Sequence, residues 1–251
     1  MMDVFIIALA NIIVGTLVGI SGIAGFLLPI IFVGYLKLNL STALALSFAS
    51  FLTSGIIGAY RYNKSGNLNI SFGIIVSIGS FIGSILGVQL NSMISLETAK
   101  LFLYLVVLCS GLSILIRKNK ENNNGDSKLL NNKLFIIFFG IITGTICSLS
   151  GAGGPILVMP ILVSLGMSIR IAIAVSLFDS IFIALPACIG YILHARNENN
   201  IFLFLIISIL FQTIGVLIGT KYSTKVNVDI LKKCVAIFSI LIAIYMILGL
   251  L

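Results

Sequence analysis

Charged residues are scarce in this sequence. Only 9% of its 251 residues are Asp, Glu, Lys or Arg, whereas a soluble domain carries roughly a quarter. With 59% hydrophobic residues and a mean hydropathy of +1.23, the chain has too little polar surface to face water. Its apolar runs are long enough to span a bilayer and lack the alternating pattern of barrel strands. The sequence therefore predicts an all-α integral membrane protein.

Residues that carry catalysis or bind metals are also few. The chain has seven acidic residues and one histidine, which is too little for a clustered catalytic site, so an enzyme is not expected. Its four cysteines lie in or beside apolar segments without a C-x-x-C pair, so we expect neither a metal site nor a disulfide. No Walker-type phosphate loop is present, which argues against ATP hydrolysis. We expect no cofactor.

Positive charge exceeds negative charge, with a net charge of +8. The basic residues lie between the apolar segments, where they orient a protein in the lipid bilayer, so we expect no nucleic-acid partner. The start of the chain, Met1-Met2-Asp3, has no basic region and no cleavage site, so we take it as mature sequence. The Asn-rich stretch from Asn119 to Lys133 is typical of a polar linker.

Eight apolar segments follow one another along the chain. The first and fifth are too long for one crossing, and each contains a Gly-rich break, Ser21 to Gly25 and Ser150 to Gly154. The segments cover approximately residues 4–36, 40–60, 70–90, 101–116, 134–167, 171–193, 201–220 and 234–251.

The two breaks belong to an internal duplication. With a shift of 129 residues, small and hydroxyl residues coincide in the same order in both halves. The duplication predicts a first membrane repeat at 1–117, a linker at 118–133 and a second repeat at 134–251. The coinciding landmarks are Gly15-Thr16 with Gly144-Thr145, Ser21-Gly22 with Ser150-Gly151, Gly25 with Gly154, and Ala43, Ala45 and Ser47 with Ala172, Ala174 and Ser176.

The distribution of Lys and Arg decides between two topologies. If every long segment crosses once, eight basic residues lie on one side and seven on the other, which is no bias. If each Gly-broken segment returns to its starting side, only Lys37, Lys100 and Arg196 remain on the poorer side and the other twelve lie opposite. This second arrangement predicts external termini, a cytoplasmic linker and two halves inverted relative to one another. Each half then has a Gly-broken helical hairpin, either re-entrant or a pair of short crossings, plus three transmembrane helices.

Breaks of this kind predict a binding site. Unpaired backbone is costly in hydrocarbon, and discontinuous helices in inverted repeats surround the substrate in many secondary transporters. Helices that resume at Phe26 and Pro155 would direct their N–H groups toward an anion. Close helix packing or a kink is the alternative role of these glycines. The predicted substrate-binding residues are Ser21, Gly22, Gly25, Ser47, Ser50, Ser150, Gly151, Gly153, Gly154 and Ser176.

Polar residues inside the apolar segments are further candidates. Ser47, Ser50 and Ser54 form a hydroxyl stripe on one helical face, and Asp179 stands in the second half where the first has Ser50. Asp179 is the only acid well inside an apolar segment, which makes it a candidate for proton coupling, with a structural acid as the alternative. The single His194 is expected at the surface.

Three further residue groups are assigned to packing. Gln89 and Gln212 are expected to form structural hydrogen bonds near segment ends or between helices. The G-x-x-x-G patterns at Gly79, Gly83 and Gly87 and at Gly215 and Gly219 predict close helix crossings, within the chain or in a homodimer.

The duplicated pattern resembles the sulfite exporter TauE/SafE family over nearly the whole chain. In the second half, "GTICSLSGAGGPILVMP" and "AIAVSL" are similar to the family's signature, whereas the first half departs from it at "SGIAGF". These proteins are small membrane permeases linked to sulfite, sulfonates and related organosulfur anions. The resemblance implies a secondary transporter that moves such an anion across the cell membrane. A non-transporting scaffold or assembly subunit and an anion channel are the alternatives.

Overall fold

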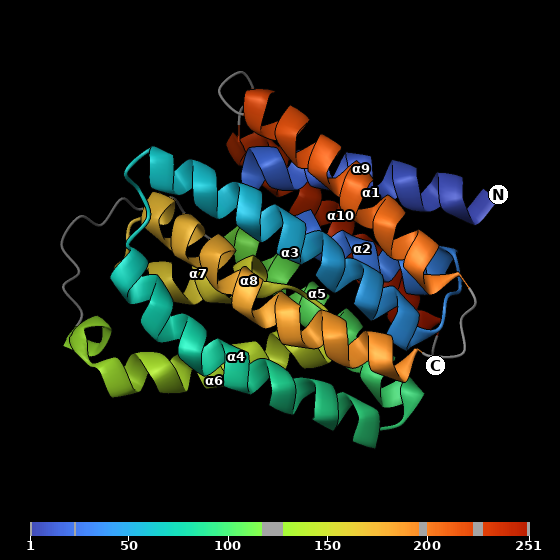
Figure 1. Cartoon of the computed structure of the whole chain (residues 1–251), viewed down its shortest axis with the longest axis horizontal. Coiled ribbons are helices and arrows are strands. Elements are labelled where there is room, and N and C mark those ends of the chain that lie inside the picture. Colours follow the sequence, from blue (N-terminus) through green and yellow to red (C-terminus); the bar gives the residue numbers. More distant parts are fainter. Residues whose placement is uncertain (1, 23, 117–127, 196–199, 223–227, 250–251) are drawn as a thin grey trace.

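The chain folds into a bundle of helices (Figure 1). This computed structural model describes residues 2–22, 24–116, 128–195, 200–222 and 228–249, and all regular structure within these ranges is helical. Seven of the described helices are long and apolar enough to cross a membrane, which confirms the predicted all-α, multi-pass membrane protein. The helices are α1 (Met2–Ser21), η1 (Ala24–Phe26), α2 (Leu27–Ile30), η2 (Ile31–Tyr35), α3 (Leu40–Lys64), α4 (Ile70–Met93), α5 (Leu96–Ile116), η3 (Lys128–Asn131), α6 (Lys133–Ser150), α7 (Gly154–Ser164), α8 (Ile169–His194), α9 (Ile201–Tyr222) and α10 (Val228–Leu248).

Helices α3 and α8 form the centre of the bundle and pack against each other. About 72% of the α3 span and 67% of the α8 span is buried, against 50% or less for the other spanning helices. Helix α4 packs between α8 and α6, and α9 packs between α3 and α1. Each central helix is thus linked through one helix to the long arm of a Gly-broken segment. The surrounding helices carry the large exposed apolar side chains, such as Phe202 and Ile206 on α9, as expected of a surface in contact with lipid.

The glycine patterns serve close helix crossings within the chain. A Cβ atom added at Gly215 of α9 would lie 2.5 Å from the backbone oxygen of Ile12 in α1, and one at Gly219 would collide with that of Thr16. A Cβ at Gly79 or Gly83 of α4 would likewise collide with the backbone of α6. The predicted role of the G-x-x-x-G glycines is thus confirmed, and the crossings are intramolecular.

Three of the long helices begin at asparagine caps. The side chain of Asn39 accepts a hydrogen bond from Ser41 N, that of Asn69 from Phe72 N, and that of Asn132 from Leu134 N. Each cap satisfies an amide that the helix itself cannot pair, and this is why α3, α4 and α6 begin where they do.

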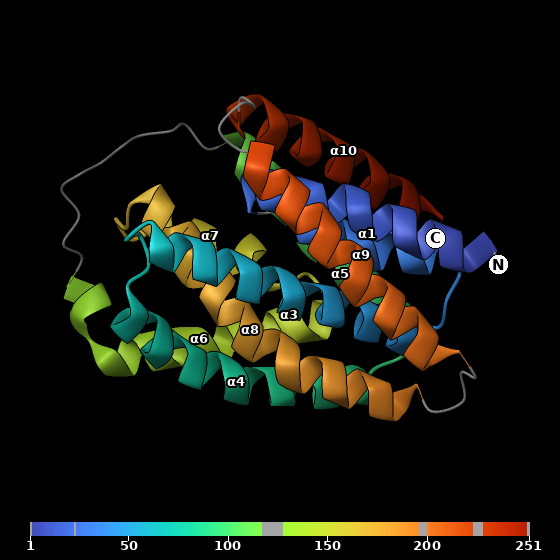
Figure 2. The same ribbon diagram turned by 45° about the horizontal axis from the view of Figure 1, so that its top comes forward.

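Four helix ends define the two ends of the bundle. The start of α1 and the end of α10 lie together, and the end of α5 and the start of α6 lie at the other end (Figures 1 and 2). We call these the termini end and the linker end. Residues 118–127 of the predicted linker, 118–133, lie outside the described residues. The division into two inverted repeats stays a prediction.

Each Gly-broken segment combines a long and a short arm. Helices α1 and α6 have 20 and 18 residues and are candidate membrane spans. The arms that follow, Ala24–Tyr35 and Gly154–Ser164, are shorter apolar helices. At 1.5 Å per residue they measure only about 16–18 Å, roughly half the hydrocarbon thickness. The long arm and the short arm together return the chain to the end from which it came (Figure 1).

Candidate functional site

Left-handed glycines end the two long arms. Helix α1 ends at Ser21, and Gly22 has φ of +76°. Helix α6 ends at Ser150, and Gly151 and Gly153 have φ of +70° and +77°. Glycine adopts this conformation without the steric cost that other residues meet, so the sequence stops both helices at these points.

The helices resume almost where the sequence predicts. The first short arm begins at Ala24, two residues before the expected Phe26. The second begins at Gly154, with Pro155 in its first turn, where the missing amide proton is no loss. Ile23, in the middle of the first break, lies outside the described residues.

The two breaks meet around one small cavity. Gly22 and Gly25 line it from the first half, and Ala152, Gly153 and Pro155 line it from the second. Its volume is about 20 Å³, which is room for about one water molecule. Segments about 129 residues apart in the sequence therefore form a common site.

Phe51 of α3 fills the space between the breaks. A Cβ atom added at Gly25 would lie 2.7 Å from Phe51 Cε1, and one added at Gly153 would lie 3.2 Å from Cδ2 on the other edge of the ring. The ring is thus in contact with both glycines. The duplication aligns Phe51 with Ser180, which also lines the cavity.

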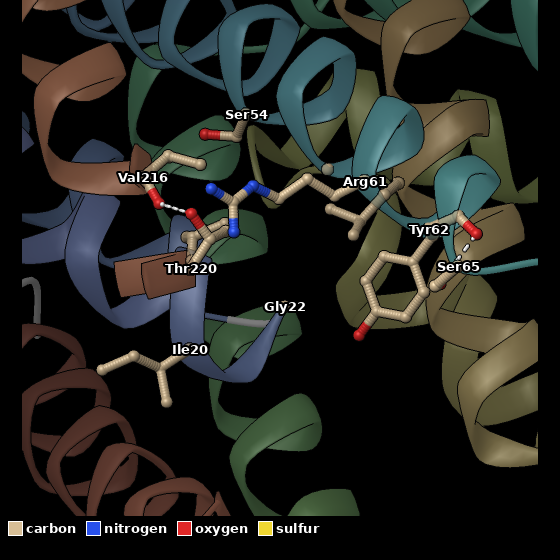
Figure 3. A pocket seen from close by; sticks show the side chains of 12 residues that line it. Ile20, Gly22, Ser54, Arg61, Tyr62, Ser65, Val216 and Thr220 are labelled. Carbon is tan, nitrogen blue, oxygen red and sulfur yellow. Dashed lines mark hydrogen bonds between the residues drawn. The ribbon is translucent and has the colours of Figure 1, made fainter. Parts of the chain in front are cut away.

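A wider cavity continues from this point to the linker end. It shares Val18, Gly22, Ser54 and Leu177 with the small cavity, and its volume is about 210 Å³. Arg61 and Tyr62 of α3, Ser65 directly after this helix, and Thr220 of α9 complete much of its wall (Figure 3). The small cavity is thus open toward the linker end.

Aromatic side chains occupy the path toward the termini end. Tyr191 of α8 is buried, donates a hydrogen bond of 2.8 Å to Ser148 O, and stacks on Phe48 with ring centroids 5.8 Å apart. Phe48 in turn contacts Phe51 edge to face, with centroids 5.6 Å apart. The tyrosine also lines a separate cavity of about 250 Å³ at the termini end. These three rings therefore separate that cavity from the breaks.

Comparison with known proteins places the chain in a family. Residues 6–246 match the model of the sulfite exporter TauE/SafE family. The chain belongs to this family. It is 26% identical to "Probable membrane transporter protein YdhB" of Bacillus subtilis over 239 residues, covering 94% of this chain and 95% of the relative.

Two further relatives have similar names. A "Probable membrane transporter protein" of Haemophilus influenzae is 28% identical, covering 92% of this chain and 93% of the relative. "Probable membrane transporter protein MJ0441" of Methanocaldococcus jannaschii is 30% identical, covering 88% and 84%. No solved structure matches the chain. The predicted family is confirmed, and the chain is a member of a family of membrane transporters.

The TauE/SafE chain brings only part of the predicted substrate site to the cavities. Gly22, Gly25 and Gly153 line them. The remaining predicted residues lie near the breaks or in the buried faces of α3 and α8, and none of them lines the two connected cavities. These residues are Ser21, Ser47, Ser50, Ser150, Gly151, Gly154 and Ser176.

Several of these hydroxyls are engaged in local hydrogen bonds. Ser47 donates to Ala43 O and Ser176 to Ile173 O, each within its own helix. Ser150 donates to Cys147 O and accepts from the amide of Ala152, so it stabilises the turn of the second break. Such bonds shape the helix ends from which the break glycines project.

The predicted stripe on α3 meets a glutamine from α9. Ser50 donates to Asn11 Oδ1 at 2.7 Å, and Ser54 accepts from Gln212 Nε2 at 2.7 Å. Gln212 is fully buried, and its Oε1 has no hydrogen-bond partner among the described residues. Of the stripe, Ser54 is the member that reaches both cavities.

Asp179 lies between helices rather than at the cavity wall. Its carboxylate accepts hydrogen bonds from Ser77 at 3.2 Å and from Ser80 at 3.0 Å, both on α4. The carboxyl group is fully buried. Its role in proton coupling stays a prediction, now with two defined hydroxyl partners.

The sequence reasoning missed Phe51, Arg61 and Tyr191. A signal for Arg61 was present, because Ser47, Ser54 and Arg61 recur at seven-residue spacing on one face of α3. His194 is exposed, as predicted. Among the described residues, no group of three His, Cys, Asp or Glu side chains could hold a metal ion.

Proposed function

We propose that this protein is a secondary transporter that moves sulfite, a sulfonate or a related organosulfur anion across the cell membrane. The observation that carries the proposal is the meeting of Gly22 and Gly25 with Gly153 around one small cavity, which adjoins a wider cavity at the linker end. Discontinuous helices that meet in this way bind substrate in many secondary transporters. Membership of the TauE/SafE family supports the substrate class.

The chemistry of the breaks suits an anion. Helix α7 begins at the cavity, so the positive end of its dipole and its unpaired amides lie beside it. No described Asp or Glu lines either connected cavity, so no negative charge there opposes an anion. The ten predicted residues, with Ser54 added, remain the candidates for contact as the cavity widens during transport.

The two ends of the path suggest an alternating mechanism. The duplication aligns Tyr191 with Tyr62, Phe48 with Leu177 and Ser148 with Gly19. The first residue of each pair belongs to the group that closes the termini end, and the second lines the open cavity. In the opposite state, we expect Tyr62 to pack on Leu177 and donate to the carbonyl of Gly19. The Tyr191 ring then withdraws, and the anion leaves toward the termini end.

The orientation follows from the basic residues. Arg61 and Lys64 lie at the linker end of α3, and Lys133 begins α6 at the same end. The positive-inside rule then places the linker end in the cytoplasm and the termini outside, in the plasma membrane. The open cavity accordingly faces the cytoplasm.

Flux measurements in proteoliposomes test the function. The purified protein is reconstituted, and uptake of sulfite, thiosulfate, sulfate and ethanesulfonate is compared with that of protein-free liposomes. We expect saturable flux of at least one organosulfur anion or sulfite. Flux that rises linearly with concentration would indicate a channel, and absence of flux for every anion would indicate a scaffold or assembly subunit.

A further inference from the structure

Arg61 is exposed and lies at the mouth of the wide cavity. It lies in the last turn of α3, where a long basic side chain ordinarily extends outward to the membrane surface. Instead it lines the cavity and points toward Ser54 and Thr220 (Figure 3). No described carboxylate forms an ion pair with it, so the guanidinium is available to an anion.

The other mouth has no equivalent charge. The duplication aligns Arg61 with Gly190, which has no side chain. The cavity at the termini end is lined by Asn39, Asn91 and His194 among others, and no described Lys or Arg contributes to it. The two mouths therefore differ in charge although the helices around them correspond.

A second cation reinforces the field at the linker end. Arg170 lies in the first turn of α8, which begins at the same end of the bundle. Charge of one sign in a cleft with apolar walls concentrates small ions of the opposite sign. The linker-end mouth is therefore the one that attracts anions.

We infer that Arg61 forms an entry site that captures a sulfonate or sulfite from the linker end. The inference rests on the proposed function and deepens it by naming the group that binds the anion and the side on which it binds first. A guanidinium offers a planar pair of N–H donors that fits two oxygens of one oxyanion. The hydroxyls of Ser54 and Thr220 already donate to Ser50 O and Val216 O, so the guanidinium supplies the donors. The small cavity at the glycine breaks shares four lining residues with the wide cavity.

Thiol labelling tests the site without requiring transport. Ser65→Cys places a reporter on the cavity wall, in a background in which the exposed Cys109 and Cys234 are replaced by Ser. Its labelling rate is measured with the anionic 2-sulfonatoethyl and the cationic 2-trimethylammonioethyl methanethiosulfonates at low ionic strength. We expect Arg61→Gln to lower the anion-to-cation rate ratio about tenfold, and we expect salt to reduce this effect. Arg61→Lys should retain most of the ratio, since the charge remains.

Two controls make the result specific. Lys133→Gln removes a charge at the same end of the bundle that is distant in sequence from the reporter and does not line the cavity, and it should leave the ratio unchanged. A reporter at Ser92→Cys, in the termini-end cavity, should not respond to Arg61→Gln and shows that this variant is folded.

An unchanged ratio in Arg61→Gln, or an equal loss in Lys133→Gln, overturns the entry site. Neither result bears on the flux experiment, and absence of flux with a normal ratio would refute transport alone. The two proposals therefore fail separately.

Discussion

Two glycines with the same backbone conformation provide the sharpest test of the path. Gly153 has φ of +77° in the second break, and Gly66 has φ of +72° in the turn after α3. Alanine at either position must adopt a left-handed backbone conformation, which lowers the stability of the folded protein by roughly 1–2 kcal/mol because alanine has a Cβ atom. A Cβ at Gly66 would have no atom within 4 Å, whereas one at Gly153 would lie 3.2 Å from Phe51.

The two variants should therefore differ in transport far more than in stability. A methyl group at Gly153 is about the size of the water molecule that the cavity of about 20 Å³ can hold. It would also displace the Phe51 ring by a few tenths of an ångström. We expect Gly153→Ala to reduce flux at least tenfold, equivalent to about 1.4 kcal/mol in the barrier, and Gly66→Ala to retain it.

Thermal unfolding and proteoliposome flux, measured on the same preparations, provide the comparison. Both variants should unfold at slightly lower temperatures than the unmodified protein. Normal flux through Gly153→Ala, at a stability equal to that of Gly66→Ala, would refute the reasoning, because an obstructed break would then leave transport untouched.

Three further predictions concern the ring closure and the buried acid. Tyr191→Phe removes the hydrogen bond to Ser148 O, which costs about 1 kcal/mol. The rate at which a thiol reagent added at the termini end labels Ser54→Cys should therefore rise about fivefold. An unchanged rate would mean that this hydrogen bond does not hold the path closed. Phe51→Ala should enlarge the central cavity and broaden the range of anions transported, as a competition panel of sulfite, sulfate and larger sulfonates would reveal; unaltered selectivity would place the ring outside the path. Asp179→Asn should abolish flux driven by a pH gradient while exchange of anion at equal pH continues, and pH-driven flux in this variant would remove the proton-carrier role.

The helical spans could be predicted because their causes are local. The length of an apolar run and the asparagine caps at Asn39, Asn69 and Asn132 are properties of neighbouring residues. The breaks are local as well, since Gly22 and Gly153 stop the helix by their own backbone conformation. The sequence accordingly predicted the helix ends at the two breaks to within about two residues, whereas the end of α3 and the starts of α5 and α10 differ from the predicted segments by four to six residues.

The contents of the site depended on contacts between distant residues. In the sequence, Phe51 does not differ from the other apolar residues of α3. Only the structure shows that Gly25 and Gly153 lie against the two edges of its ring. Arg61 was counted as a membrane-flanking charge, because sequence alone does not indicate whether a long side chain turns outward or inward. Asp179 is the only acidic residue in its apolar segment, and its hydrogen-bond partner Ser80 is 99 residues away in the sequence, so the sequence did not indicate this pair.

By itself, the sequence determined that this chain crosses a membrane as helices, that two glycine breaks interrupt them and that the chain is a TauE/SafE-family protein. These conclusions follow from hydrophobicity, from the backbone freedom of glycine and from the order of motifs, all of which are properties of residues that are close together in the sequence. Only the tertiary structure decided that the breaks share one cavity, that Arg61 faces into its mouth and that Tyr191 closes the other end. Each of these depends on which helix packs beside which, and packing joins residues that the sequence keeps apart.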